Sequence, residues 1–242
     1  MAGHGGDALW DGGSCHRVLL AAGHSLDAAG LTGPAVTWWR ELAAGSHRLL
    51  GPGHPDTVQA GALLADALLA AGQATEAVTW FQWVLAGRAD VLGPDDPGTL
   101  TARLRLAGAC LAAGKTRDTI AQCKRVLAGR ERALGADHPD TLAARARLAA
   151  AYDAAGQMSA ALQLHQQACA GYERVFGGDH LDTLARRADL AHAYHAAGQA
   201  GEAVTLLRDT ITRSEQALSP GDPLTQALRQ ALAGITGEMT AR

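Results

Sequence analysis

A period of 42 residues dominates the sequence. Threonine recurs at this spacing at Thr57, Thr99, Thr141, Thr183 and Thr225. A glycine that closes an Ala-Ala-Gly tripeptide recurs at the same spacing, at Gly30, Gly72, Gly114, Gly156 and Gly198. Two series with one period indicate a repeated structural unit, and units of this length form stacked arrays in which each repeat packs on its neighbours.

Each repeat predicts two helices. The Ala-Ala-Gly tripeptide follows an apolar periodic segment, which is typical of a helix that stops at a left-handed glycine. The turn before Thr141 contains Pro139, and proline suits the first position of a helix. For this unit we expect helix A over about residues 139–155 and helix B over about residues 159–176.

Neither helix pair can bury its own apolar face, so stacked neighbours must form the core. We therefore predict an all-α, right-handed superhelical solenoid of eleven helices in a single domain, 1–242. Its parts are a segment 1–13, a degenerate repeat 14–56, repeats 57–98, 99–140, 141–182 and 183–222, and a capping helix 223–240. In the cap, Leu224, Leu228 and Leu232 should face inward, with Gln226 and Gln230 outward.

Charge and composition argue against several classes of protein. The net charge is -3 with no basic run, so no electrostatic footprint for nucleic acid is present. No apolar stretch approaches the roughly 20 residues that span a membrane. The N-terminus lacks the pattern of a secretory signal, which predicts a cytoplasmic protein. The four cysteines, Cys15, Cys110, Cys123 and Cys169, have no metal-ligand spacing and are expected as small buried hydrophobes.

The repeat resembles a known family. Leu-Ala-x-x-Tyr in helix A, Glu-Ala at the start of helix B and the linkers Gly51-Pro-Gly-His-Pro-Asp-Thr57 and Ala136-Asp-His-Pro-Asp-Thr141 resemble the tetratricopeptide repeat, in the 42-residue variety of kinesin light chains and many bacterial regulators. The resemblance implies a concave groove, lined by helix A, that binds a protein or peptide. It also implies a sensor or adaptor arm of a bacterial regulatory system, although this chain has no phosphate-binding loop of its own. The asparagine pair with which related repeats hold the ligand backbone is absent, for example at Ala62-Leu63.

The flank of helix A beside its buried face predicts the groove residues. They are Asp66, Leu69, Leu104, Arg105, Leu111, Arg147, Asp153, Asp189, His192 and His195. The leucines suit an apolar anchor and the two arginines an acidic flank. Asp189, His192 and His195, with Asp153 from the neighbouring helix, also have metal-ligand chemistry. We favour a solvated polar wall with a pH-sensitive contact, and predict no metal and no cofactor.

An arginine recurs in the centre of the buried face of helix A, at Arg103, Arg145, Arg187 and Arg229. Fourteen residues before the last three stand Glu131, Glu173 and Glu215, whereas Ala89 occupies that position before Arg103. A buried charge needs a partner. We therefore predict structural ion pairs between repeats; the alternative is a row of arginines that holds a ligand.

Four of the five tryptophans fall in helix B of the first two repeats. Trp39 shares its repeat position with core residues, as does Phe81, and both are predicted to be buried. Trp38, Trp80 and Trp83 lie off that face and should be partly exposed, as a convex tryptophan patch. Residues 1–13 with Trp10 could cover this patch, or a partner or second copy could dock there.

The sequence carries no catalytic pattern. It has no Gly-x-Ser-x-Gly motif, no cysteine with a plausible histidine partner on a shared face, and no paired carboxylates that the repeat places in a closed pocket. We predict a non-catalytic scaffold that binds a protein or peptide in its groove. The alternative is a scaffold that self-associates, as a homodimer, through the tryptophan patch.

Overall fold

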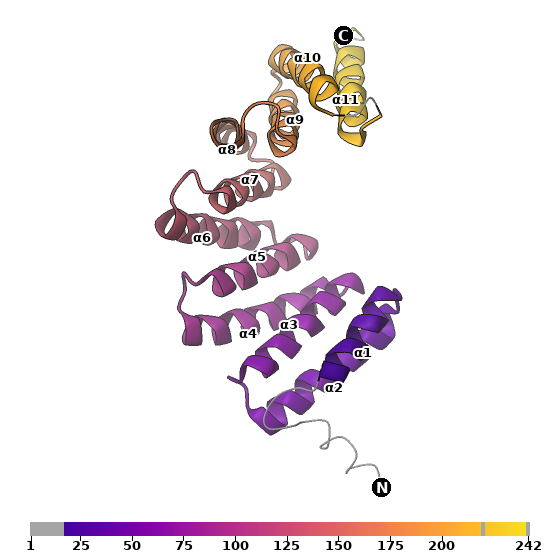
Figure 1. Ribbon diagram of the computed structural model, residues 1–242, viewed down its shortest axis with the longest axis vertical. Helices are drawn as coiled ribbons and strands as arrows, with labels where there is room; N and C mark the ends of the chain where they lie inside the picture. The colour runs from indigo at the N-terminus through magenta and orange to yellow at the C-terminus, as the bar shows by residue number, and fades with distance from the viewer. Residues whose placement is uncertain (1–16, 219–220, 241–242) are drawn as a thin grey trace. The chain divides into compact units, whose positions relative to one another are not determined.

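The computed structural model describes residues 17–218 and 221–240, and these residues form helices without any strand (Figure 1). Residues 1–16, including Trp10 and Cys15, lie outside the described part. The helices are α1 (Arg17–Ala28), α2 (Thr32–Leu50), α3 (Pro55–Ala70), α4 (Ala74–Leu92), α5 (Pro97–Ala112), α6 (Thr116–Leu134), α7 (Pro139–Ala154), α8 (Met158–Phe176), α9 (Leu181–Ala196), α10 (Ala200–Ala217) and α11 (Pro223–Thr240).

The eleven described helices confirm the prediction of an all-α repeat fold. Odd-numbered helices are the A helices of the sequence pattern and even-numbered helices are the B helices. In the unit on which the pattern was defined, α7 and α8 begin and end within one residue of the expected bounds. Periodicity therefore located both helices of a repeat correctly.

Glycines end the helices of both kinds. Gly72 after α3 has φ 76°, in the left-handed region where glycine has no steric penalty, as predicted for the Ala-Ala-Gly series. A second series with positive φ follows the B helices, represented by Gly93 with φ 91° after α4. The sequence analysis did not identify this second series.

From α3 onward most of the A helices begin with a proline and a side-chain cap, whereas α9 begins with Leu181 in place of the proline. Pro55, Pro97 and Pro139 stand in the first turn of α3, α5 and α7, as predicted. The residue before each helix accepts a hydrogen bond from the first turn: a histidine before α3, α7 and α9, and Asp96 before α5. The histidines stand in the linker motif, but the sequence analysis gave them no role.

The chain divides into two compact units, Met1–Gln122 and Cys123–Arg242. In the first unit, helices adjacent in sequence pack on one another, and Trp39, Leu64, Leu68 and Phe81 are fully buried between them. In the second unit α7 to α11 pack in the same sequential manner. The right-handed superhelix and the single domain 1–242 remain predictions.

The last helix has the polarity of a capping helix. Leu228 is buried, Leu224 and Leu232 are half-buried, and Gln226 and Gln230 are exposed. Gln226 occupies the repeat position at which the earlier A helices bury an aliphatic side chain, as α9 buries Leu184. At this position α11 is therefore more polar than the earlier A helices, and its role as a cap remains a prediction.

Candidate functional site

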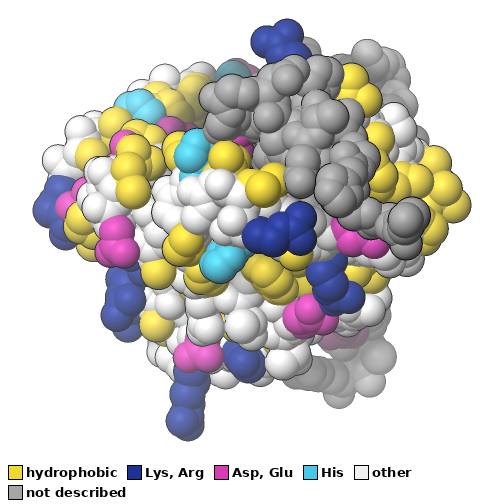
Figure 2. Space-filling view, turned by 90° about the horizontal axis from the view of Figure 1, so that it is seen from below, with side chains coloured by type: hydrophobic (Ala, Val, Ile, Leu, Met, Phe, Trp, Pro, Cys, Tyr) yellow, Lys and Arg dark blue, Asp and Glu magenta, His cyan; other side chains and the backbone are white. Residues whose placement is uncertain are grey.

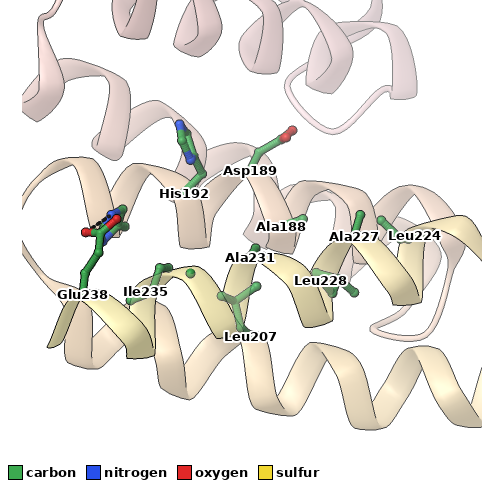
Figure 3. A pocket seen from close by; sticks show the side chains of 12 residues that line it. Ala188, Asp189, His192, Leu207, Leu224, Ala227, Leu228, Ala231, Ile235 and Glu238 are labelled. Carbon is green, nitrogen blue, oxygen red and sulfur yellow. Dashed lines mark ion pairs between the residues drawn. The ribbon is translucent and has the colours of Figure 1, made fainter. Parts of the chain in front are cut away.

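A hollow of about 390 Å³ lies between α9 and α11 in the second unit, with α10 contributing to its floor (Figure 3). Its lining is Ala188, Asp189, His192, His195, Leu207, Leu224, Ala227, Leu228, Ala231, Gly234, Ile235 and Glu238. Most of these residues are apolar, and the polar ones come from α9 and from the C-terminal end of α11. The hollow therefore joins an apolar floor to a polar edge.

The helical register explains this division. Asp189, His192 and His195 recur every three residues and so share one face of α9. On α11, Ala231 and Gly234 face the hollow with little or no side chain, which leaves room above the buried floor. Three residues assigned to the groove from sequence are thus brought together in one site.

The polar edge is partly self-paired. Arg186 donates to Asp189 with the nitrogen and oxygen 2.9 Å apart, and His195 Nε2 lies 3.4 Å from Glu238 Oε2 (Figure 3). His195 Nδ1 is buried without a hydrogen-bond partner, whereas His192 is exposed. The edge thus carries two carboxylates, each with one partner within the protein, beside the exposed imidazole of His192. No group of three or more metal-ligating side chains with suitable geometry occurs among the described residues.

Asp153 does not extend this edge, because it contacts a buried side chain of its own unit; its assignment to the groove stays a prediction. Its Oδ2 lies 2.7 Å from Nε2 of His165, a side chain that is buried between α7 and α8. The equivalent positions of the first repeat repeat this contact, because Trp39 Nε1 donates to Asp27 Oδ2 over 3.0 Å. A buried ring nitrogen requires a partner, so the acid of helix A turns toward the core.

The other predicted groove residues are distributed between the two units. In the first unit Leu111 is 46% exposed, Leu69 and Leu104 are half-buried, and Arg105 donates to Asp66. Burial raises the pKa of Asp66, an effect that the Arg105 guanidinium opposes. In the second unit Arg147 is exposed. The pairing with Asp66 leaves Arg105 less available for an acidic ligand than the sequence indicated.

The arginine row has the acidic contacts that its spacing predicted. The arginine and glutamate side chains lie 2.8 Å apart for Arg145 and Glu131, 2.5 Å for Arg187 and Glu173, and 2.7 Å for Arg229 and Glu215. Arg187 also donates to Asp209 and Thr210, which the sequence analysis did not foresee. Arg103, which has no glutamate at the equivalent position, donates to Gln122 over 3.0 Å.

The second repeat replaces this arginine by an aromatic contact. Gly61 occupies the arginine position of α3, and a Cβ built on it would lie 2.5 Å from Cζ3 of Trp83. Trp83 in turn occupies the repeat position of Asp209, the partner of Arg187. In α3 and α4, the indole of Trp83 packed on Gly61 therefore occupies the space that Arg187 and Asp209 occupy in α9 and α10.

The tryptophans are packed more closely than the sequence indicated. Trp39 is fully buried, as predicted, while Trp38, Trp80 and Trp83 are half-buried. Trp38 Nε1 donates to the carbonyl of Leu19 over 3.0 Å, and the rings of Trp80 and Trp83 meet edge to face with centroids 5.8 Å apart. Each ring therefore has a structural contact within the first unit.

One cysteine of the second unit has a histidine on the same helix face. His165 and Cys169 are four residues apart on α8 and both are buried, so a cysteine does share a helix face with a histidine. Burial and the neighbouring Glu173 raise the pKa of the Cys169 thiol to about 11. Because the thiolate is the nucleophile, this environment opposes the chemistry of a catalytic cysteine. Cys110 and Cys123 are also free and buried.

The surface shows no single-sign charge field on the face drawn in Figure 2, where hydrophobic, acidic, basic and histidine side chains alternate among the coloured residues. Within residues 17–218 and 221–240, no helix is both long and apolar enough to cross a membrane.

Repeated helix pairs with a hollow beside the A helices define an α-helical repeat protein. Two family models described as tetratricopeptide repeat match the chain, one over residues 60–121 and 99–174 and the other over residues 183–224. No curated protein matches it. The chain belongs to the tetratricopeptide repeat family and is of the kinesin-light-chain-like type.

Solved structures support this assignment. A Podosopora anserina structure of nearly identical TPR-like repeats of the kinesin light chain type is 30% identical, with a TM-score of 0.77 over 84% of this chain and 96% of that chain. BtubC (BKLC) from P. vanneervenii is 18% identical, with a TM-score of 0.70 over 85% and 81%. The apo form of RapI is 10% identical, with a TM-score of 0.72 over 93% and 63%. The last two show the fold alone.

Proposed function

We propose that this tetratricopeptide repeat protein, a protein-interaction scaffold by its family, binds a partner through the hollow between α9 and α11. The observation that carries the proposal is the combination of an apolar floor with the carboxylates of Asp189 and Glu238 at its edge. A volume of about 390 Å³ lies at the small end of the range for ligand pockets, about 300–1,000 Å³. It suits one large apolar side chain of a partner, flanked by a lysine or arginine that meets the acidic edge.

A substitution in α11 tests this site. Ala231 is exposed and lines the hollow, so Ala231→Arg should fill it and repel a cationic flank. Peptides selected from a random display library on the purified chain should share an apolar residue next to Lys or Arg. Their affinity, measured by fluorescence anisotropy, should fall at least about tenfold in Ala231→Arg, which corresponds to about 1.4 kcal/mol.

Ala233→Arg is the matched control, because Ala233 is exposed on the same helix but does not line the hollow. It should leave the affinity unchanged.

Binding should also weaken from pH 8 to pH 5.5, because imidazolium at His192 or His195 repels the cation. Replacing both histidines by alanine should remove that dependence. Peptides that bind Ala231→Arg as tightly as the original chain contradict the proposed site.

The remaining groove residues form a second part of the proposal. Leu111 is the most exposed of the three leucines assigned to an apolar anchor, with Leu69 and Leu104 half-buried. If selected peptides lose affinity in Leu111→Glu rather than in Ala231→Arg, the anchor lies in the first unit.

The sensor or adaptor role in a bacterial regulatory system, and the cytoplasmic location, rest on the family resemblance.

Self-association through the tryptophan patch is the alternative function. It is favoured by the partial exposure of Trp38, Trp80 and Trp83 on neighbouring B helices. Under this hypothesis Trp80→Gln combined with Trp83→Arg converts a dimer to a monomer, as measured by size-exclusion chromatography with light scattering, and leaves the helical circular dichroism intact. A chain that is monomeric before the substitutions excludes the alternative.

A further inference from the structure

The residues that cap the A helices carry two kinds of side chain, imidazole and carboxylate, although the backbone of the two kinds has nearly the same conformation before α3 and α5. The cap residue before α3, His54, has φ -69° and ψ 138°, and the cap before α5, Asp96, has φ -60° and ψ 140°. His138 and His180 cap α7 and α9 in the same way, and Asp222 accepts from the first turn of α11. Three of these five linkers thus carry a histidine cap, before α3, α7 and α9, and two carry a carboxylate cap, before α5 and α11.

The histidine caps depend on an unprotonated ring nitrogen. Nδ1 of each imidazole accepts from the amide of the residue two positions later, over 3.2 Å before α3, 3.1 Å before α7 and 3.2 Å before α9. A nitrogen accepts only while it carries no proton, so each of these hydrogen bonds requires a ring whose proton is on Nε2 alone. Protonation turns Nδ1 into a donor and places a positive charge at the positive end of the helix dipole.

The carboxylate caps lack this sensitivity. Asp96 Oδ1 accepts from the amide of Gly98 over 2.7 Å, and Asp222 Oδ1 accepts from Leu224 over 2.8 Å. A carboxyl group keeps an acceptor oxygen in either protonation state. The linkers before α5 and α11 thus act as internal controls for the other three.

The surroundings of His138 add little compensation for a charged ring. Asp140 follows in the first turn of α7, and its carbonyl accepts from Arg130 of α6 over 2.8 Å. The adjacent Asp137 is held by Arg174 of α8, with the two charged groups 2.5 Å apart. Asp137 is therefore already paired and arginines from both flanking B helices face this linker, which leaves the Asp140 carboxylate in the first turn to attract a charged ring.

His54 and His180 differ in their neighbours. Asp56 follows His54, and Arg88 of α4 lies beside the same linker. Nδ1 of His180 lies 3.7 Å from Oδ2 of Asp182, so a protonated ring gains some attraction there. The other acid of this linker, Asp179, is held 2.9 Å from Arg213 of α10, and Phe176 of α8 stacks on the His180 ring. We expect the smallest response at His180.

We propose that the linkers before α3, α7 and α9 are acid-sensitive: mild acid removes the histidine cap and loosens the first turn of these three helices, while α5 and α11 keep theirs. The first turns carry buried core residues, Thr57, Leu142 and Leu184 among them. Loss of the caps therefore weakens the packing between repeats as well as the helix ends. This inference does not rest on the proposed binding site.

The test replaces the three histidines by the cap that α5 uses. We expect the thermal midpoint of the original chain, followed by circular dichroism, to fall between pH 7.5 and pH 5.5 by roughly 5 °C more than that of the triple variant His54→Asp, His138→Asp, His180→Asp. The variant His192→Gln, at an exposed histidine that caps no helix, should fall as the original chain does. An equal fall in the triple variant and the original chain overturns the proposal.

Nuclear magnetic resonance on the unmutated, ¹⁵N-labelled chain provides a second measurement. The imidazoles of His54, His138 and His180 should carry their proton on Nε2 at pH 7.5. The amides of Asp56, Asp140 and Asp182 should shift together with their titration, whereas the amide of Gly98 should not. A proton on Nδ1 of these rings at pH 7.5 overturns the proposal whatever the stability of the variants.

Discussion

Replacing Gly61 by alanine is expected to destabilise the protein, although alanine is the better helix former. A Cβ at this position would lie 2.5 Å from Cζ3 of Trp83 and 3.5 Å from Cε3 of Trp80. These rings meet edge to face, so neither moves without losing its contact with the other. We expect a cost of about 1–3 kcal/mol, typical of overpacking. The thermal midpoint should fall by about 5 °C, as measured by circular dichroism.

Gly108 provides the matched control for this substitution. It lies within α5, another A helix, and a Cβ there would meet nothing within 4 Å. Gly108→Ala should therefore raise stability by up to about 1 kcal/mol through helix propensity alone. If both substitutions stabilise the chain to the same extent, Trp83 does not pack on Gly61 as the structure describes.

A rescue experiment tests the exchange between repeats. Gly61→Arg alone places a long side chain under Trp83 and should destabilise. Adding Trp83→Asp recreates the pair that Arg187 and Asp209 form between α9 and α10. The double variant should recover stability relative to Gly61→Arg, because an arginine and its carboxylate then occupy the space of the indole.

Removal of Glu131 is the second change with a large expected effect. The Arg145 side chain is only 10% exposed and lies 2.8 Å from the Glu131 carboxylate. Glu131→Ala takes that carboxylate from a nearly buried guanidinium, and charge-assisted hydrogen bonds contribute about 1.5–3 kcal/mol. We expect the free energy of unfolding to fall by about 2 kcal/mol in urea titration.

The equivalent pair near the C-terminus, Arg229 and Glu215, makes the same contact in a solvent-exposed position. Arg229 lies 2.7 Å from Glu215 but its side chain is 51% exposed. Glu215→Ala should cost less than about 0.5 kcal/mol, as exposed ion pairs do. A double-mutant cycle on Glu131 and Arg145 should show coupling that the cycle on Glu215 and Arg229 lacks. Equal costs at the two sites rule out burial as the origin of the effect.

The third pair, Glu173 and Arg187, tests the contribution of a single ion pair less well than the repeat spacing indicated. From the sequence alone, Glu173 and Arg187 are as suitable for testing the structural role of the ion pairs as any other pair of the row. In the structure Arg187 also contacts Asp209 and Thr210, so Glu173→Ala leaves the guanidinium with two partners. We expect its cost to lie between those of Glu131→Ala and Glu215→Ala. The number of partners therefore depends on what helix B of the same repeat carries, which here is Asp209 and Thr210 of α10.

The sequence by itself determined the repeat, its helices and the family. Apolar spacing and glycine act over a few residues, so Ala-Ala-Gly at Gly156 and Pro139 at a helix start located α7 and α8 without any knowledge of their packing. The repeat period also placed Glu131 near Arg145, because it relates each helix to its successor by one constant offset. Asp189, His192 and His195 share a site because they lie three residues apart on one helix, α9.

Only the tertiary structure decided which side chains turn inward and where the space lies. Asp153 has the register of a groove residue, yet it binds His165, because a buried imidazole needs a partner that only the packed α8 presents. Trp83 has the register of a surface residue, yet it covers Gly61, because the missing side chain opened a place for it. The hollow between α9 and α11 likewise depends on small residues of one helix facing another. Such contacts join residues far apart in sequence, and periodicity carries no information about the volume between them.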